Sequence, residues 1–175
     1  MFKTIAIVVV LVIAGILIYA ATQPDDFRVQ RTTSIKAPPE KILPLITDLH
    51  SWGSWSPWEK IDPAMKRTYS GAAGGTGAAY AWQGNSKVGE GRMEIVDVSP
   101  PSKVTIKLDF VKPIEGHNTA EFTLEPKGGS TDVTWAMYGP TAYIAKIIGI
   151  FVSMDGMIGK EFETGLSNLK AVAEK

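Results

Sequence analysis

The sequence contains no cysteine and only two histidines among its 175 residues. The absence of cysteine excludes disulfide bonds, thiol chemistry, cysteine metal sites and lipid attachment through cysteine. His50 and His117 lie far apart in the chain, so a zinc site would need carboxylate ligands that no pattern in the sequence indicates. We therefore expect no bound metal and no cofactor.

Neither positive nor negative charge is in excess, because 18 Lys and Arg residues balance 18 Asp and Glu residues. Lys3 precedes a long apolar run at the N-terminus; without it the balance is 17 against 18. Such a composition gives no basic surface of the kind that attracts nucleic acid. We expect no nucleic-acid partner.

Catalytic motifs are also missing. No Gly-x-Ser-x-Gly elbow is present, and the Gly-rich stretch 71–77 is not followed by Lys-Ser/Thr or by a helical pattern, so it indicates a hairpin rather than a phosphate loop. The carboxylates Glu94, Asp109 and Glu121 fall on the solvent-facing parity of predicted strands. The sequence therefore names no catalytic residue; it leaves enzymatic activity open and favours ligand binding without chemistry.

One apolar run stands out, the 17 uncharged residues Ile5–Ala21. A bilayer-spanning helix needs about 17–25 residues, whereas the apolar region of a signal peptide is usually about 7–15. Signal peptidase sites have small residues at −3 and −1, but the candidates here place Ile18 or Tyr19 at −3. We interpret residues 1–23 as an uncleaved transmembrane signal anchor and 24–26 as a linker. A cleaved signal peptide is the alternative.

The charges that flank this run predict its orientation. Lys3 and the amino group precede it, and Asp25 and Asp26 follow it. By the positive-inside tendency, residues 4–22 cross the membrane once with the N-terminus in the cytoplasm. The domain formed by residues 27–175 is then extracytoplasmic, and periplasmic in a Gram-negative cell.

Beyond the anchor, apolar and polar residues alternate with a period of two in short stretches separated by Gly and Pro. The predicted strands are 27–35, 65–69, 78–83, 90–98, 104–110, 120–125 and 133–137. A proline-led helix that includes Ile42 and Leu45 is expected after the first strand. Short strands joined by tight turns predict an antiparallel meander.

The C-terminal segment from Asp155 predicts a long amphipathic helix. Its apolar residues recur at spacings of three and four: Ile158, Phe162, Leu166, Leu169, Val172 and Ala173. Gly165 lies within this stripe, where a side chain would hold a packing partner away. A helix with one apolar face needs an apolar surface to cover it. The predicted fold is therefore α+β, a curved antiparallel sheet around one long C-terminal helix, preceded by the transmembrane helix.

Several short stretches carry a resemblance to a known family. They are Ile35-Lys36-Ala37-Pro38-Pro39-Glu40, Trp52…Trp55-Ser56-Pro57-Trp58, Gly77…Tyr80-Ala81-Trp82-Gln83-Gly84-Asn85, Gly89-Glu90-Gly91-Arg92-Met93 and Ser99-Pro100-Pro101. With them, residues 27–175 resemble the polyketide cyclase/dehydrase and lipid-transport family of the START-like (SRPBCC) superfamily. The resemblance implies the helix-grip fold and the binding of hydrophobic molecules. It implies no catalytic residue, because no catalytic motif is shared across the family.

The apolar faces of the strands form a concave surface larger than one helix covers, so the interior is either a filled core or a cavity. The candidate ligand-binding residues are large apolar side chains expected on this surface or beside it: Trp52, Trp55, Tyr80, Trp82, Met93, Phe110, Trp135, Met137, Phe151 and Met154. The tryptophans between Trp52 and Trp58 have two interpretations, core packing or an aromatic wall for an apolar ligand.

Three functions follow from this interior. The first is a membrane-anchored domain that binds a lipid or another hydrophobic small molecule between the sheet and the C-terminal helix. The second is an enzyme of the polyketide cyclase or hydrolase type that uses polar groups in the same pocket. The third is a structural module with a filled core.

The segment Thr141–Met154 has two possible positions. It is apolar around a single charge, Lys146. It is either covered on both sides, by the sheet and by Trp52–Trp58, or open at the mouth of the pocket near the bilayer. We hypothesise that it is the lid of the pocket and its contact with lipid, with core packing as the alternative.

Overall fold

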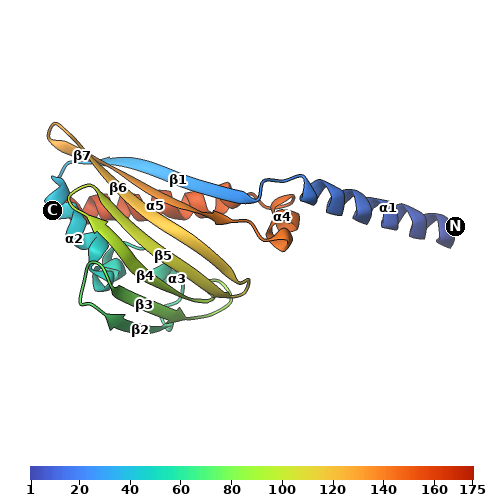
Figure 1. The fold of residues 1–175 in the computed structure, drawn as a ribbon, viewed down its shortest axis with the longest axis horizontal. Helices are drawn as coiled ribbons and strands as arrows, with labels where there is room; N and C mark the ends of the chain where they lie inside the picture. Colours follow the sequence, from blue (N-terminus) through green and yellow to red (C-terminus); the bar gives the residue numbers. More distant parts are fainter.

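The computed structural model describes residues 1–175 and contains one seven-stranded antiparallel sheet (Figure 1). The helices are α1 (Phe2–Ala21), α2 (Pro39–Thr47), the 3-10 helix η1 (Leu49–Ser54), α3 (Trp58–Ile61), α4 (Tyr143–Gly149) and α5 (Met154–Ala173). The strands are β1 (Asp26–Ile35), β2 (Lys66–Gly71), β3 (Ala78–Gln83), β4 (Glu90–Ser99), β5 (Lys103–Lys112), β6 (Gly116–Lys127) and β7 (Ser130–Pro140). The predicted strands are all present, most of them longer than the apolar pattern indicated.

The sheet is a meander with one exception to sequence order. The strands are ordered β1-β7-β6-β5-β4-β3-β2, so the first strand pairs with the last. Phe27 lies opposite Gly139 and Ile35 opposite Thr131 in this pairing. The stretch 71–77 connects β2 to β3 as a hairpin, as predicted. The β1–β7 pairing places the linker after α1 beside the chain that leaves β7, which determines where the candidate site forms.

Helix α5 lies along the concave face of the sheet and packs mainly on β1 (Figure 1). Phe162, Leu166 and Leu169 are buried, which confirms the predicted apolar face. A Cβ atom at Gly165 would lie 2.7 Å from a ring carbon of Trp135, so the absence of a side chain permits this close approach. The α+β helix-grip architecture predicted from the sequence is confirmed.

Aromatic rings fill the interior beside the middle of α5. The Trp135 ring stacks on Phe162 with a centroid distance of 4.3 Å, and Trp52 lies 4.8 Å from Trp55. The indole N–H groups of Trp52 and Trp55 donate to backbone carbonyls of α2. These two tryptophans are therefore packed and hydrogen-bonded within the core.

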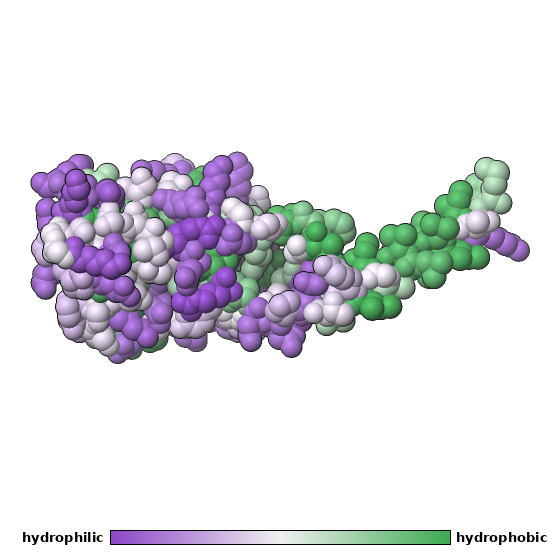
Figure 2. Space-filling model, turned by 90° about the horizontal axis from the view of Figure 1, so that it is seen from above, coloured by the Kyte–Doolittle hydropathy of each residue, from purple (hydrophilic) through white to green (hydrophobic).

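Helix α1 extends away from the domain (Figures 1 and 2). Its 20 residues span about 30 Å at about 1.5 Å per residue, the thickness of a bilayer hydrocarbon core. Ala20 is its one buried residue. By length and composition α1 is able to cross a membrane, a property that signal sequences share.

The segment 141–154 forms α4, a turn, and the start of α5. The Ser153 hydroxyl caps α5 by accepting a 3.0 Å hydrogen bond from the Gly156 N–H. Helix α4 packs beside α1. Several of its apolar side chains, together with two in the following turn, are exposed: Tyr143, Ile144, Ile148, Phe151 and Val152. The expectation that this segment is covered on both sides is wrong, because no element lies over its outer surface.

Candidate functional site

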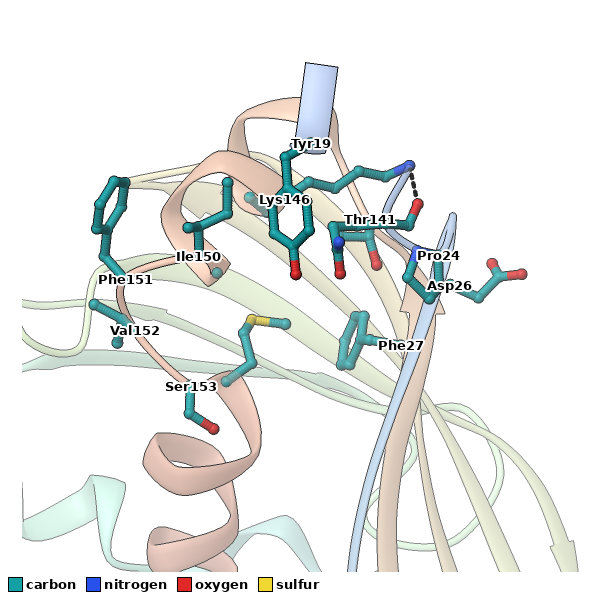
Figure 3. A pocket seen from close by; sticks show the side chains of 14 residues that line it. Tyr19, Pro24, Asp26, Phe27, Thr141, Lys146, Ile150, Phe151, Val152 and Ser153 are labelled. Atoms are coloured by element: carbon teal, nitrogen blue, oxygen red, sulfur yellow. Dashed lines mark hydrogen bonds between the residues drawn. The ribbon is translucent and has the colours of Figure 1, made fainter. Parts of the chain in front are cut away.

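A cavity of about 660 Å³ lies where α1, β1, α4 and α5 meet (Figure 3). Its volume falls within the range of about 300–1,000 Å³ that is typical of small-molecule sites. The lining residues come from the end of α1, the linker, the start of β1, the residue after β7, α4, and the turn into α5: Tyr19, Gln23, Pro24, Asp26, Phe27, Thr141, Ala145, Lys146, Gly149, Ile150, Phe151, Val152, Ser153 and Met154. The cavity is open to its surroundings over much of its surface.

Apolar side chains from α1, β1 and the turn after α4 border this cavity. Figure 3 shows Tyr19 descending from α1, Phe27 projecting from β1 and Ile150 beside them, with the exposed Phe151 ring on the outer side of the turn. Phe27 is two residues from Val29, which pairs with Met137 of β7. The cavity therefore adjoins the apolar concave face at the end of the sheet nearest α1.

Lys146 connects α4 to the linker at the edge of the cavity. Its side chain is buried, and its Nζ donates to the Gln23 carbonyl at 2.9 Å and to Asp25 Oδ1 at 2.5 Å. This hydrogen bond and the lysine charge lower the pKa of Asp25. The Thr141 N–H also donates to the Asp25 carbonyl, at 2.6 Å. The linker is thus held against α4 by side-chain and backbone contacts.

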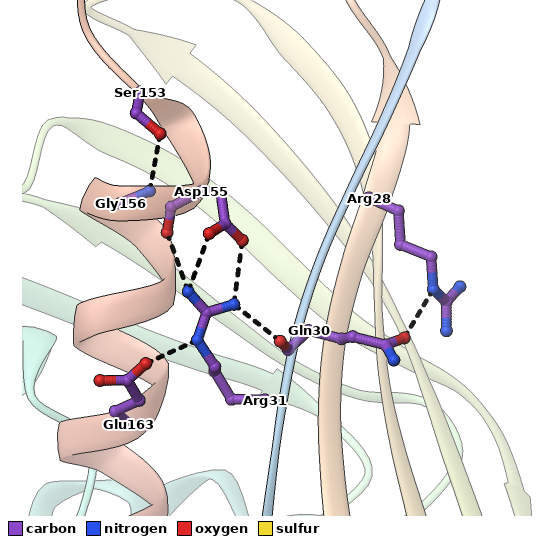
Figure 4. Close-up of polar contacts among 7 residues, drawn as sticks. All are labelled: Arg28, Gln30, Arg31, Ser153, Asp155, Gly156 and Glu163. Atoms are coloured by element: carbon purple, nitrogen blue, oxygen red, sulfur yellow. Dashed lines mark hydrogen bonds and ion pairs between the residues drawn. The ribbon is translucent and has the colours of Figure 1, made fainter.

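Arg31 holds the start of α5 against β1 (Figure 4). Its guanidinium binds both carboxylate oxygens of Asp155, at 2.9 and 3.0 Å, and Glu163 at 2.6 Å. These contacts raise the pKa of Arg31 and lower that of Asp155. A Cβ atom at Gly159 would fall within the guanidinium, so this glycine makes room for the arginine.

A second polar cluster lies at the corner of α3, β2 and β3. Glu59 accepts hydrogen bonds from Arg67 Nε at 2.6 Å and from the Tyr80 hydroxyl at 2.7 Å. Burial and the Glu59 contact raise the pKa of Tyr80. Each carboxylate oxygen of Glu59 takes part in one of these contacts, so the cluster ties α3 to β2 and β3.

The two histidines make local contacts. His50 stacks on Tyr69 with a centroid distance of 3.9 Å. His117 Nδ1 lies 2.7 Å from Asp109 Oδ1, and this contact lowers the pKa of Asp109. No group of three or more His, Cys, Asp or Glu side chains is arranged to hold a metal ion.

The family model for polyketide cyclase/dehydrase and lipid-transport proteins matches residues 26–174. The chain belongs to this family. No curated protein sequence matches the chain. Membership in the polyketide cyclase/dehydrase and lipid-transport family agrees with the resemblance found in the sequence.

Solved structures share the fold of this family member at low sequence identity. A protein from Chromobacterium violaceum has a TM-score of 0.59 and 14% identity, over 87% of this chain and 99% of that chain. A Mesorhizobium loti protein has a TM-score of 0.60 and 16% identity, covering 83% and 96%. The major latex-like protein 151 of Panax ginseng has a TM-score of 0.58 and 14% identity, covering 87% and 100%.

The structure separates the ten predicted ligand-binding residues into three groups. Trp52, Trp55 and Trp135 belong to the aromatic core. A second group lies along the concave face of β3–β7: Tyr80, Trp82, Met93, Phe110 and Met137. Phe151 and Met154 line the cavity. Ligand contact by any of the ten stays a prediction.

Sequence reasoning missed the polar partners of the site. Arg31 fell on the apolar parity of β1, which signalled an inward charge, but nothing identified Asp155 and Glu163 as its partners. Lys146 was visible as the one charge of its segment, whereas its contact with Asp25 depends on the β1–β7 pairing. The sequence places Phe27 in a predicted strand and carries no sign that it lines a cavity.

Proposed function

We propose that this family member is a membrane-anchored domain that binds a lipid or another hydrophobic small molecule. Helix α1 is the anchor, with the N-terminus in the cytoplasm and the domain on the other side. The proposal depends above all on one observation, that the cavity shares its apolar wall between the end of α1 and the domain. A ligand there contacts Tyr19 of the anchor together with Phe27 and Met154 of the domain.

The physical driving force for binding is burial of apolar ligand surface. Each Å² of apolar surface removed from water contributes about 25 cal/mol, and Phe27, Ile150, Phe151 and Met154 provide the matching surface. The polar groups at the rim, Lys146 among them, suit an amphiphile whose polar end stays near the linker.

Native mass spectrometry of the detergent-extracted full chain tests this function. We expect a bound mass on the protein that corresponds to a lipid or a small apolar molecule. Met154→Gln places a polar group in the cavity wall and should weaken the apolar contact with the ligand. A loss of about 1.4 kcal/mol in binding free energy lowers the affinity of the protein for the ligand about tenfold. Met157→Gln is the matched control, because Met157 lies on the same helix, is 58% exposed and does not line the cavity.

The structural-module alternative is supported by the aromatic core beside α5, which is filled by rings rather than open. A wild-type protein that carries no bound mass, with Met154→Gln and Met157→Gln indistinguishable, would favour that alternative. The enzymatic alternative requires polar groups free to react in the cavity, whereas the ion-paired Glu59 and Arg31 clusters lie outside its lining.

A further inference from the structure

Helix α4 and the turn after it expose apolar side chains beside the end of α1. Ile144 is 51% exposed, Ile148 42%, Phe151 70% and Val152 46%. Figure 2 shows hydrophobic surface along α1 and again at the adjoining end of the domain, whereas hydrophilic residues dominate the rest of the visible face. Exposed apolar area that borders a membrane helix needs a covering layer in solution or in the bilayer.

A hydrogen bond fixes how far along α1 this surface reaches. The Tyr143 hydroxyl donates to the Leu17 carbonyl at 2.7 Å. Leu17 precedes the last residue of α1, Ala21, by four positions, or about 6 Å at about 1.5 Å per residue. When α1 spans the membrane, the start of α4 therefore lies level with the last turn of the spanning helix.

We propose that α4 and the turn Ile150–Ser153 lie in the interfacial layer of the membrane, with their exposed apolar side chains among the upper acyl chains. The covering partner is thus the lipid surface itself. Tyr143 occupies the position that interfacial tyrosines prefer, with the ring beside apolar surface and the hydroxyl hydrogen-bonded. This inference rests on the anchor of the proposed function and does not depend on ligand binding in the cavity.

The charge of this surface defines the kind of membrane contact. Lys146 is the one charged residue between Thr141 and Met154, and it is paired with Asp25. No free cations are left on the segment to attract anionic headgroups, so contact comes from apolar insertion. We therefore expect the segment to contact zwitterionic phosphatidylcholine as well as it contacts anionic lipids, and we expect this contact to depend little on salt.

The consequence concerns how the cavity is reached. Ile150, Phe151 and Val152 border the cavity and belong to the same turn that meets the lipid. The cavity mouth is then held at the outer leaflet, and a hydrophobic molecule passes between bilayer and cavity without crossing water. The Lys146–Asp25 contact ties the linker to α4 beside this mouth.

The absence of cysteine makes a depth measurement direct, because single cysteines introduced by substitution are the sole labelling sites. The full chain is placed in phosphatidylcholine nanodiscs with a bimane fluorophore at Ile148→Cys or Phe151→Cys. Nitroxide-labelled lipids quench the fluorophore according to its depth. Val9→Cys in α1 is the membrane reference, and Val96→Cys is the matched control on β4, 45% exposed and at the far end of the sheet.

We expect the labels at residues 148 and 151 to report a depth of about 5–10 Å within the headgroup and acyl boundary. The label at residue 96 should escape quenching. If residue 9 is quenched while 148 and 151 behave like residue 96, α4 does not touch the membrane and the inference is wrong. If the label at residue 9 also escapes quenching, α1 does not lie in the membrane and the anchor of the proposed function is wrong. The labels at residues 148 and 151 could also become shielded from water as the protein concentration rises, with no quenching by the labelled lipids. That result would identify a second copy of the chain as the covering layer, and it would overturn the inference as well.

Discussion

A missing methyl group at Gly165 sets the distance between α5 and the sheet. Replacing Gly by Ala in a helix normally stabilises it by up to about 1 kcal/mol. Here the added Cβ atom would meet the buried Trp135 ring at 2.7 Å and Pro57 at 3.1 Å. Overpacking of this kind costs about 1–3 kcal/mol, so we expect Gly165→Ala to lower the free energy of unfolding in chemical denaturation.

The matched control for Gly165 lies on the same helix. Gly156 has the Ser153 side chain at 3.4 Å or more, which is ordinary van der Waals contact. Gly156→Ala should therefore leave the free energy of unfolding unchanged or raise it. Equal destabilisation by the two substitutions would contradict the packing argument.

The ion pairs of Arg31 predict a pH dependence. Arg31 holds the pKa of Asp155 below its ordinary value, mainly through the side-chain hydrogen bond. A carboxyl whose folded-state pKa is depressed stabilises the fold above its unfolded pKa of about 3.9, and this contribution is lost as pH falls through the folded value. NMR titration should find the Asp155 carboxyl below its usual range in the wild type.

Two arginine variants test whether Arg31 is the group that lowers the pKa of Asp155. Arg31→Met should return the pKa of Asp155 toward the ordinary value and weaken the loss of stability on acidification. Arg28→Met is the control, because Arg28 lies on the same strand and contacts Gln30 instead. An unchanged pKa of Asp155 in Arg31→Met would show that another group sets it.

Helix α5 buries Phe162, Leu166, Leu169 and Ala173 in the core against the sheet. Phe162 is 2% exposed and Leu166 1%. Truncation of a buried large side chain costs about 2–5 kcal/mol, so Phe162→Ala and Leu166→Ala should each lower the unfolding free energy of the domain from Pro24 onward by that amount. Ser167→Ala on the exposed face should change it by less than about 0.5 kcal/mol. If both substitutions lower the unfolding free energy by less than about 0.5 kcal/mol, the packing of α5 against the concave face of the sheet would be contradicted.

The local sequence pattern predicts the buried face of α5 but leaves the environment of α4 undecided. The α5 stripe repeats at helical spacing, and it specified the buried face. Helix α4 is apolar nearly all round, a pattern that fits a fully buried helix and a lipid-facing helix equally well. Only its position beside α1 distinguishes these two environments.

For the molecule as a whole, the fate of residues 1–23 decides where the domain works. We expect the mature protein to retain this segment, because Ile18 and Tyr19 disfavour signal peptidase cleavage. Intact mass of the mature protein should therefore include residues 1–23. A species that begins near Ala21 or Thr22 would replace the anchored domain with a secreted one.

The sequence by itself determined the class of fold, the number of strands and their positions along the chain, the buried face of α5, and the presence of a helix long enough to cross a membrane. These features are local: a period of two, a period of 3.6, and a continuous apolar run each follow from neighbouring residues. The resemblance to the polyketide cyclase/dehydrase and lipid-transport family rests on local signals too, on short stretches such as Trp55-Ser56-Pro57-Trp58.

Tertiary structure decided where the cavity lies and which polar groups surround it. Arg31 meets Asp155, and Lys146 meets Asp25, across more than one hundred residues of chain. Lys146 reaches Asp25 because β1 pairs with β7, which brings the two ends of the domain to one edge of the sheet, and Arg31 reaches Asp155 because α5 packs on β1. Alternation along a strand specifies which side chains face inward, but it carries no information about which distant element lies opposite them.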